Sequence, residues 1–403
     1  MPETSRPVTT QPILLRNVRP VGFAPGEAKA PTDIVVGADG RISQVGSTLL
    51  APSGAKTIDG GGFVSPGWTD LHAHVWHGGT DISIRPREAG MARGVTTIVD
   101  AGSAGEANFH GFREYCIEPA AERILAFLNI GSIGLVACNR VSELIDIRSI
   151  DIDRTVDVAE ANRDLVVGIK CRASHVILGS WGITPVKIAK KVAKILKLPM
   201  MIHVGEPPPT YDEILELLRP GDIVTHCFNG KRGGSIVEDE DLWDLVVKCA
   251  DKGIRLDVGH GGASFSFKVA EIAIERGLLP FSISTDLHGH SIDGPVWDMA
   301  TTMSKLLAVG MPFEAVVTAS TTAPMSAVGL ATDDLLGIGK PAELTVFDLA
   351  DSALDVRDSQ GATARLHKMF EPRFAIRGTN AVAASRHMPK EGTATVCTCG
   401  AQG

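Results

Sequence analysis

Residue types that bind divalent metal ions end several short apolar segments of the chain. They are His72 and His74 at the end of FVSPGWTDLHAH, Lys170 after VVGI, His203 after PMMI, His226 after DIVT, and Asp286 after PFSIST. In a strand, side chains at positions i and i+2 lie on one face, so the imidazoles of His72 and His74 project together. A single histidine at a strand end is more often an ordinary polar residue than a ligand, but the whole set predicts one metal site.

The apolar segments are typical of strands that are buried on both faces of a parallel sheet. The strands that we predict begin near Phe63, Val95, Ile124, Val166, Pro199, Ile223, Arg255 and Phe281. Stretches at 184–198, 239–253 and 266–278 carry apolar residues at helical spacing. This alternation predicts a β/α barrel over residues 63–339, with the ligand candidates at the carboxyl ends of its strands, where barrel enzymes carry their chemistry.

Short strands separated by turns flank the barrel on both sides. Residues 13–60 contain several of them, and residues 340–388 show a similar pattern. We therefore expect segments 1–62 and 340–388 to be the two halves of a smaller β domain, and residues 389–403 to be a flexible tail.

In these residues and their order, the chain resembles the amidohydrolase superfamily of metal-dependent hydrolases, in its binuclear branch of dihydroorotase-like and amidohydrolase/deacetylase (acetyl-mandelate esterase-like) proteins. In that branch a His-x-His ends the first strand, a carboxylated lysine the fourth, single histidines the fifth and sixth, and an aspartate the eighth. The resemblance runs from the N-terminal strands to Val382. It implies an α/β fold with a (β/α)8 TIM-like barrel, and a small β-sandwich domain formed by the N- and C-terminal segments.

The resemblance also implies two divalent metal ions, with Zn²⁺ preferred by the ligand types. Their ligands would be His72, His74 and Asp286 for one ion, His203 and His226 for the other, and Lys170 as a bridge. Carbamylation by carbon dioxide would convert the Lys170 ammonium into an anionic oxygen donor. The implied reaction is hydrolysis by a hydroxide held between the metals, with Asp286 as the general acid and base.

Two further residues stand where they could bind substrate. Arg172 follows Lys170 by two residues, so a continuing strand places both on one face, and its planar guanidinium suits a carboxylate. The alternative is a surface arginine on the following loop. His260 lies among glycines that allow close approach of backbone to a ligand, and the alternative is a loop turn that contains a histidine.

One departure from the dihydroorotase pattern bears on the substrate. Dihydroorotases usually carry an arginine two residues after the second histidine, but Trp76 stands there. We therefore expect deacetylation of a small acetylated α-hydroxy or α-amino acid, of the acetyl-mandelate type, with cyclic-amide hydrolysis as the alternative. A deaminase would typically use one metal without a bridging lysine, and a non-catalytic scaffold would have lost ligands. The choice between ester and amide, and the exact substrate, stay open.

Composition narrows the setting. The chain has 403 residues and a formal net charge of −8, without a run of lysines and arginines, so we expect a small-molecule substrate and no nucleic-acid partner. The first residues lack the apolar stretch of a secretory signal, and no run of about 18 apolar residues occurs, which predicts a cytoplasmic protein without a membrane partner. Whether it forms a homo-oligomer stays open.

The cysteines indicate reduced thiols. Seven is an odd number, and only Cys397 and Cys399 lie close together, so a disulfide framework is not expected. Cys171 and Cys227 directly follow ligand candidates on their strands, and their side chains should therefore point to the opposite, packed face.

Overall fold

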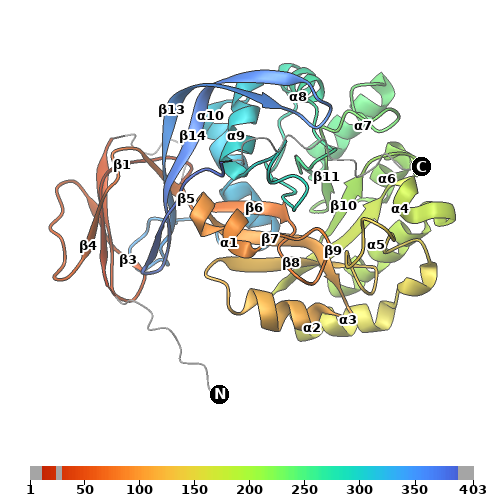
Figure 1. Cartoon of the computed structure of the whole chain (residues 1–403), viewed down its shortest axis with the longest axis horizontal. Coiled ribbons are helices and arrows are strands. Elements are labelled where there is room, and N and C mark those ends of the chain that lie inside the picture. The colour runs from red at the N-terminus through yellow and green to blue at the C-terminus, as the bar shows by residue number, and fades with distance from the viewer. Residues whose placement is uncertain (1–10, 24–29, 389–403) are drawn as a thin grey trace.

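The computed structural model describes residues 11–23 and 30–388. The predicted tail at 389–403, with Cys397 and Cys399, lies outside these residues. Within the described part, the chain forms a curled parallel sheet surrounded by helices and, beside it, a β-rich lobe (Figure 1).

The parallel sheet holds one strand from each of seven successive βα units. In spatial order its strands are β12 (Arg255–Asp257), β11 (Ile223–Thr225), β10 (Met200–Val204), β9 (Val166–Ala173), β8 (Arg123–Asn129), β7 (Val95–Gly105) and β6 (Trp68–Ala73). Residues 281–287 lie between the two edge strands and pair with both, through bridges of Ser282 to Asp257 and of Leu287 to Ala73. The sheet is therefore curled round on itself. The strand predicted from Phe281 is not a regular strand: its residues lie at the closure but pair with the edge strands through single bridges only.

The strands are buried on both faces, as their composition predicts. On β8, Ile124, Ala126 and Leu128 pack with the surrounding helices, whereas Leu125 and Phe127 join an apolar cluster on the other face of the sheet. Alternation along each strand thus separates an inner core from an outer one.

Helices cover the outer face of the sheet. They are α1 (Pro86–Ala89), α2 (Phe109–Phe112), α3 (Ile152–Ala161), α4 (His175–Leu178), α5 (Thr184–Leu196), α6 (Tyr211–Leu217), α7 (Glu240–Asp251), α8 (Phe267–Glu275), α9 (Met299–Ala308), α10 (Phe313–Ala319) and α11 (Thr322–Ala327). Short turns of 3-10 helix are η1 (Met91–Arg93), η3 (Ile147–Ser149) and η4 (Gly179–Trp181), and η2 (Arg113–Ile117) is π-helical. The helices predicted at 184–198, 239–253 and 266–278 are confirmed as α5, α7 and α8.

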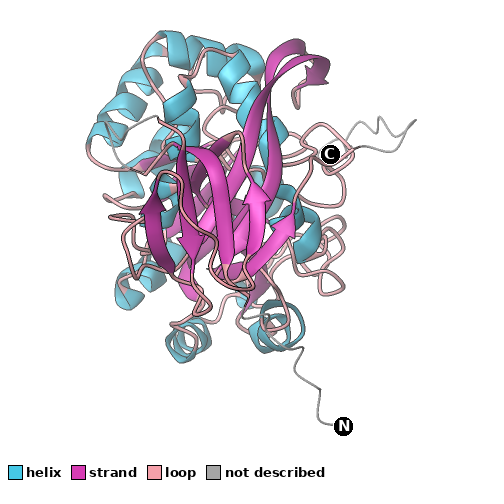
Figure 2. Ribbon diagram, turned by 90° about the vertical axis from the view of Figure 1, so that its left-hand side faces the viewer, coloured by secondary structure: helices cyan, strands magenta, loops and turns pink. Residues whose placement is uncertain are grey.

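Both ends of the chain build the β-rich lobe. Its strands are β1 (Ile13–Pro20), β2 (Thr32–Val36), β3 (Ile42–Gly46), β4 (Lys56–Asp59), β5 (Phe63–Pro66), β13 (Glu343–Arg357), β14 (Thr363–Arg377) and β15 (Asn380–Ala383). The connected order is β15-β14-β13-β5-β1-β2-β3, with β4 also on β1, so strands from opposite ends of the sequence share one sheet. Figure 2 faces this side of the molecule and shows strands lying side by side in a broad sheet. Apolar side chains of both ends, such as Leu15, Ile34, Leu344 and Ile376, pack in one buried cluster.

The apolar segment that begins at Phe63 forms two strands and not one. Its first part, β5, pairs with β1 and β13 in the lobe, and its second part, β6, lies in the curled sheet. The break falls at Gly67, where an added Cβ would lie 2.0 Å from Oγ1 of Thr96. Only glycine fits this close approach, and the sequence pattern around it does not show the neighbour that requires it.

The hairpin of β13 and β14 is long enough to belong to both parts of the molecule. It begins in the lobe, passes over α9 and α10 and ends near the start of α8 (Figure 1). Ser304 of α9 accepts a hydrogen bond from the Phe370 backbone at 3.0 Å. This hairpin is therefore a second connection between the lobe and the curled sheet, besides the covalent link at Gly67.

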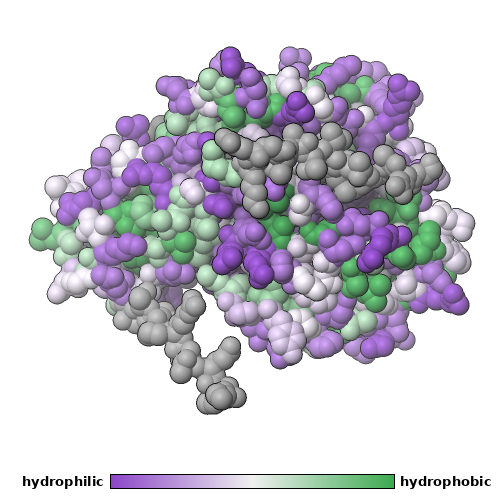
Figure 3. Space-filling view, in the orientation of Figure 1, coloured by the Kyte–Doolittle hydropathy of each residue, from purple (hydrophilic) through white to green (hydrophobic). Residues whose placement is uncertain are grey.

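The molecular surface mixes residue types. On the face seen in Figure 3, hydrophilic and hydrophobic residues are interspersed. Among the described residues, no helix combines the length and the apolar character needed to cross a membrane. The described cysteines are all free, and Cys171 and Cys227 are fully buried, as predicted.

Candidate metal centre

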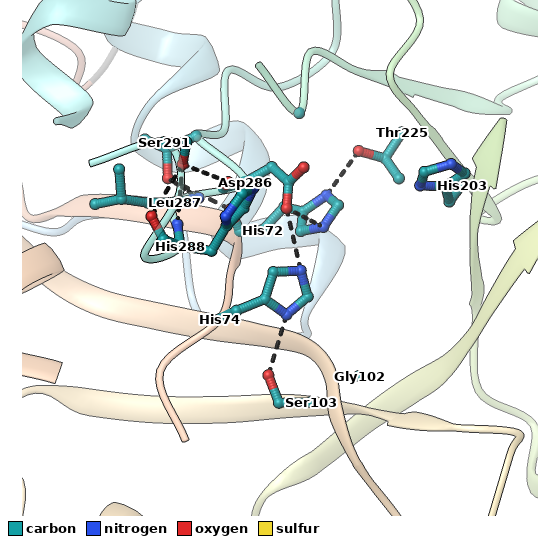
Figure 4. Close-up of polar contacts among 12 residues, drawn as sticks. His72, His74, Gly102, Ser103, His203, Thr225, Asp286, Leu287, His288 and Ser291 are labelled. Carbon is teal, nitrogen blue, oxygen red and sulfur yellow. Dashed lines mark hydrogen bonds and ion pairs between the residues drawn. The ribbon is translucent and has the colours of Figure 1, made fainter. Parts of the chain in front are cut away.

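His72 of β6, His74 directly after β6 and one aspartate of the eighth segment form the first half of the site. Asp286 Oδ1 lies 3.2 Å from His72 Nε2 and 3.1 Å from His74 Nε2 (Figure 4). Both imidazoles are almost fully buried. Three ligand-type atoms from two segments that are far apart in sequence thus converge on one point.

The second half adjoins it. His203 Nδ1 lies 2.9 Å from His226 Nε2, and Lys170 Nζ lies 3.2 Å from His72 Nε2. Ligand atoms of His72, His226 and Asp286 all lie within 4.8 Å of one another. The structure therefore brings together all the ligand candidates that the sequence indicates.

Two of these residues adopt a backbone conformation that non-glycine residues rarely adopt. His226 has φ 75° and Asp286 has φ 48°, both in the left-handed region. Such conformations cost on the order of 1–3 kcal/mol and persist where surrounding contacts hold them. Here the Asp286 amide donates to the His72 carbonyl at 2.6 Å, and His226 Nδ1 donates to the Gly259 carbonyl at 2.6 Å. The strained backbone at His226 and Asp286 directs both ligand-type side chains toward the centre of the cluster.

Polar neighbours fix the histidine rings. His72 Nδ1 lies 2.8 Å from Thr225 Oγ1, which in turn donates to Asp257 at 2.7 Å, and His74 Nδ1 lies 3.0 Å from Ser103 Oγ. With one ring nitrogen held in this way, the other is presented to the centre, as in metal sites of known proteins. Sequence reasoning missed these supporting residues, although each is a polar residue inside or directly after an apolar strand.

Asp70 is a further buried support. It accepts hydrogen bonds from the Thr285 backbone at 3.0 Å and the Thr285 hydroxyl at 2.5 Å, and so ties β6 to the segment that carries Asp286. Burial raises the pKa of the Asp70 carboxyl to about 7. Asp70 lies two residues before His72 and therefore on the same face of the strand, and this spacing could have identified it from the sequence as a neighbour of the site.

The protonation states of the histidines and of Asp286 are suited to binding a cation. Burial lowers the pKa of His72 and of His203 well below the ordinary value and that of His226 to about 4, which keeps the imidazoles neutral as metal ligands must be. Burial opposes ionisation of Asp286, but its close contacts with His72 and His74 outweigh this effect, and the pKa of Asp286 lies well below its usual range. Neutral imidazoles beside an ionised carboxylate fit a divalent metal centre.

Lys170 is unusual because it is almost fully buried inside this cluster. Burial lowers the pKa of its ammonium to about 8. A lysine in this state is partly a free amine near neutral pH, which is the form that reacts with carbon dioxide.

Known proteins are similar to this chain over nearly its whole length. A protein named deacetylase from Agrobacterium fabrum is 66% identical over 94% of this chain and 93% of its own length. A crystal structure described as a dihydroorotase is 65% identical, with a TM-score of 0.92 over 94% of this chain and 99% of that one. A crystal structure described as an adenine deaminase is 34% identical, with a TM-score of 0.84 over 92% of this chain and 99% of that one.

The chain belongs to the amidohydrolase superfamily. It is a metal-dependent hydrolase, as the resemblance in sequence implies, and enzymes of this superfamily use a divalent metal centre and act on small molecules. A scan against family models finds none that matches.

Within this superfamily fold, Arg172 stands beside the predicted ligands. It is the strand partner of His203 in the register of β9 and β10. Its Nε and Nη2 donate to the carboxylate of Glu143 at 2.8 and 2.6 Å, and Glu143 is fully buried. Burial disfavours the charged form of Arg172, but the charge and hydrogen bonds of Glu143 outweigh it, so the pKa of Arg172 lies above its ordinary value.

His260 has partners within the protein. Its Nδ1 donates to the Gly261 carbonyl at 2.9 Å, its Nε2 lies 2.9 Å from Lys305 Nζ, and its ring stacks on Phe265 with centroids 4.5 Å apart. The side chain is fully buried. Both ring nitrogens are thus engaged, and the substrate contact predicted for His260 stays a prediction.

Proposed function

We propose that this amidohydrolase removes the acetyl group from a small acetylated α-hydroxy or α-amino acid, of the acetyl-mandelate type. The observation that carries the proposal is the position of Arg172 next to His203, on the same sheet face as Lys170. A guanidinium beside a metal centre selects a substrate with a carboxylate next to the scissile bond. The relative from Agrobacterium fabrum, named deacetylase, supports the acetyl group as the part that is removed.

The ligand set fits two divalent ions, with Zn²⁺ as the preferred metal. In this proposal His72, His74 and Asp286 would hold one ion, His203 and His226 would hold the other, and Lys170 as its carbamate would supply oxygen donors to both. When bound, such a pair lowers the pKa of a water between the ions and polarises the scissile carbonyl.

The protein's own groups supply binding and proton transfer. Arg172 would contact the substrate carboxylate through Nη1 and the outer edge of Nη2, because Glu143 already accepts from Nε and Nη2. Asp286 would accept the proton of the attacking water and deliver it to the leaving oxygen or nitrogen. Oδ1 of Asp286 contacts His72 and His74, which leaves Oδ2 on the side of Gly261 for this task.

The curled sheet would be the (β/α)8 barrel of the superfamily, predicted for residues 63–339, although β5 at its start lies in the sheet of the lobe. The lobe would be its β-sandwich domain, formed by 1–62 and 340–388. His260 would contribute to substrate binding through the shape of its loop, since its ring nitrogens are engaged.

Metal content tests the centre. We expect close to two divalent ions per chain by elemental analysis, and a carbamate on Lys170 detected by ¹³C NMR after exchange with labelled bicarbonate. Lys170→Ala should lose the carbamate signal and one or both ions. A single ion with an unmodified lysine would contradict the binuclear site.

A substrate screen tests the activity. It should compare acetylated hydroxy acids and N-acyl amino acids of both hands with dihydroorotate and hydantoins. We expect one stereoisomer of a small acetylated acid to have the highest kcat/KM.

Cyclic-amide hydrolysis is the second candidate, because the structure that is 65% identical is described as a dihydroorotase. Against it, the position two residues after the second histidine, which carries an arginine in dihydroorotases, holds Trp76, whose ring packs on Phe112 with centroids 5.5 Å apart. If dihydroorotate is the best substrate in the screen, this second candidate replaces the first.

A further inference from the structure

The turn between β13 and β14 reaches the loop that follows β12. This turn, residues 358–362, is here named the hairpin tip. Asp358 Oδ1 accepts hydrogen bonds from the backbone of Gln360 at 2.8 Å and of Ala362 at 2.9 Å, so the tip is internally braced. Asp358 Oδ2 accepts from the Phe267 amide at 2.9 Å, at the start of α8. The tip is thus a structured element that rests on the barrel.

Ser359 contacts the backbone of the β12 loop directly. Its hydroxyl donates to the Gly261 carbonyl at 2.8 Å, with a longer contact of 3.4 Å to the His260 carbonyl. Its amide donates to the Phe265 carbonyl at 3.0 Å. The hairpin tip therefore contacts the backbone of the β12 loop at two points, Gly261 and Phe265.

Lys305 of α9 is a second support on the same loop. It is fully buried, and its ammonium lies 2.9 Å from His260 Nε2 and donates to the carbonyls of Pro295 at 2.6 Å and Arg357 at 2.7 Å. A lysine ammonium has three donors, and these partners use all of them. Lys305 thus joins the β12 loop, the loop after the eighth segment and the hairpin, and the proposed reaction assigns it no task.

Gly261, which the hairpin tip contacts, lies in turn against Asp286. Gly261 has φ +55°, and an added Cβ would lie 2.4 Å from Asp286 Oδ2. Its amide donates to the Thr285 carbonyl at 2.9 Å. The Gly261 backbone therefore lies directly against the carboxylate oxygen that is not used by His72 and His74.

We infer that the hairpin tip is a positioning element of the active site: Ser359, supported by Lys305, holds the Gly261 backbone against Asp286 and so sets the orientation of that carboxylate. This inference rests on the role proposed for Asp286. It gives the β-rich lobe a part in the reaction, because the hairpin that carries Ser359 is anchored there.

Ser359→Ala is the test. We expect kcat to fall about tenfold with little change in KM, because a misplaced catalytic group affects the reaction more than ground-state binding. We also expect metal loss to a chelator, followed without substrate, to become several-fold faster. Ser359→Thr, which keeps the hydroxyl, should restore both values. Ser352→Ala is the matched control, since that hydroxyl accepts only from Leu354 within the same hairpin.

The outcomes separate this inference from the proposed function. If Ser359→Ala retains wild-type kcat and metal retention while Asp286→Asn is inactive, the positioning role is overturned and the role of Asp286 stands. If Asp286→Asn keeps its activity, the proposed role of Asp286 fails independently of the hairpin. A fall in Tm without a change in kcat per folded molecule would make Ser359 a purely structural residue and would also overturn the inference.

Lys305→Met provides a second measurement. It removes the bonds to all three segments, and we expect a larger loss of kcat than for Ser359→Ala. If this variant does not fold, the serine variants alone decide the question.

Discussion

The two ends of the curled sheet both carry charged residues, but they use them differently. At the carboxyl end, buried histidines, Lys170 and Asp286 point toward one another. At the amino end, a cavity of about 750 Å³ is lined by Arg163, Arg219, Arg255 and Asp222, among others. Charge alone therefore does not distinguish the candidate metal centre from the opposite end of the curled sheet.

Hydrogen-bond partners do distinguish them. At the amino end, Arg219 donates to the Leu198 carbonyl at 2.6 Å, and Arg255 donates to the Gly221 carbonyl at 3.1 Å. Asp222 is fully buried and accepts from Lys190 at 2.5 Å and from the Met200 amide at 2.9 Å. The side chains at the amino end form hydrogen bonds with backbone groups and with one another. The ligand-type atoms at the carboxyl end converge on a common point. This division matches β/α barrels generally, in which the carboxyl end carries chemistry and the amino end stability.

Among the variants that test this difference between the two ends of the sheet, the largest loss of turnover is expected at Asp286. Asp286→Asn should reduce turnover by about 10⁴-fold, because it removes the proton acceptor while keeping nearly the same shape. Steady-state kinetics and thermal unfolding should be measured together. Asp222→Asn is the matched control at the amino end, and its kcat per folded molecule should stay close to that of the wild type. Activity of Asp286→Asn within a few-fold of wild type would remove Asp286 from the reaction.

A smaller effect is expected at Arg172. Arg172→Met should cost about 2–4 kcal/mol in kcat/KM for anionic substrates and much less for neutral analogues, since only the former lose a charged contact. Because the change also leaves the Glu143 carboxylate buried without its partner, the ratio of anionic to neutral substrates is the decisive measurement. Equal losses for both kinds would show that Arg172 orders the site without contacting a carboxylate.

Asp222 should affect stability and not catalysis. Asp222→Ala should lower the free energy of unfolding by about 2–4 kcal/mol, because it leaves the Met200 amide and Lys190 without their acceptor. Denaturant unfolding measures this loss. A strong fall in kcat per folded molecule, without loss of stability, would contradict the division between the two ends.

The smallest effect is expected at Arg163, whose side chain is 42% exposed and donates to the Leu196 carbonyl. Arg163→Met should change the free energy of unfolding by about 0.5 kcal/mol or less and leave kcat/KM unaltered. It also serves as the arginine control for Arg172→Met. A large loss of activity would point to a function of the amino-end cavity.

The strands and the metal-ligand candidates could be predicted from the sequence because both depend on local patterns. Apolar strands that end in His72, His203 and Asp286 combine a period of two with a chemically distinct last residue, and a parallel arrangement collects such ends at one edge. The amphipathic helices, such as α5, follow from the same kind of local periodicity. The register of β9 and β10 then places Arg172 beside His203.

Only the tertiary structure decided which partners these residues have. Glu143 lies 29 positions from Arg172, Lys305 lies 45 from His260, and Ser359 lies 98 from Gly261. The division of the segment after Phe63 into two strands likewise depends on Thr96 lying against Gly67. Periodicity and residue type constrain a side chain's face and its chemistry, but contacts across such separations arise from how whole elements pack. The sequence therefore determined what the centre is made of, and packing determined what holds it in place.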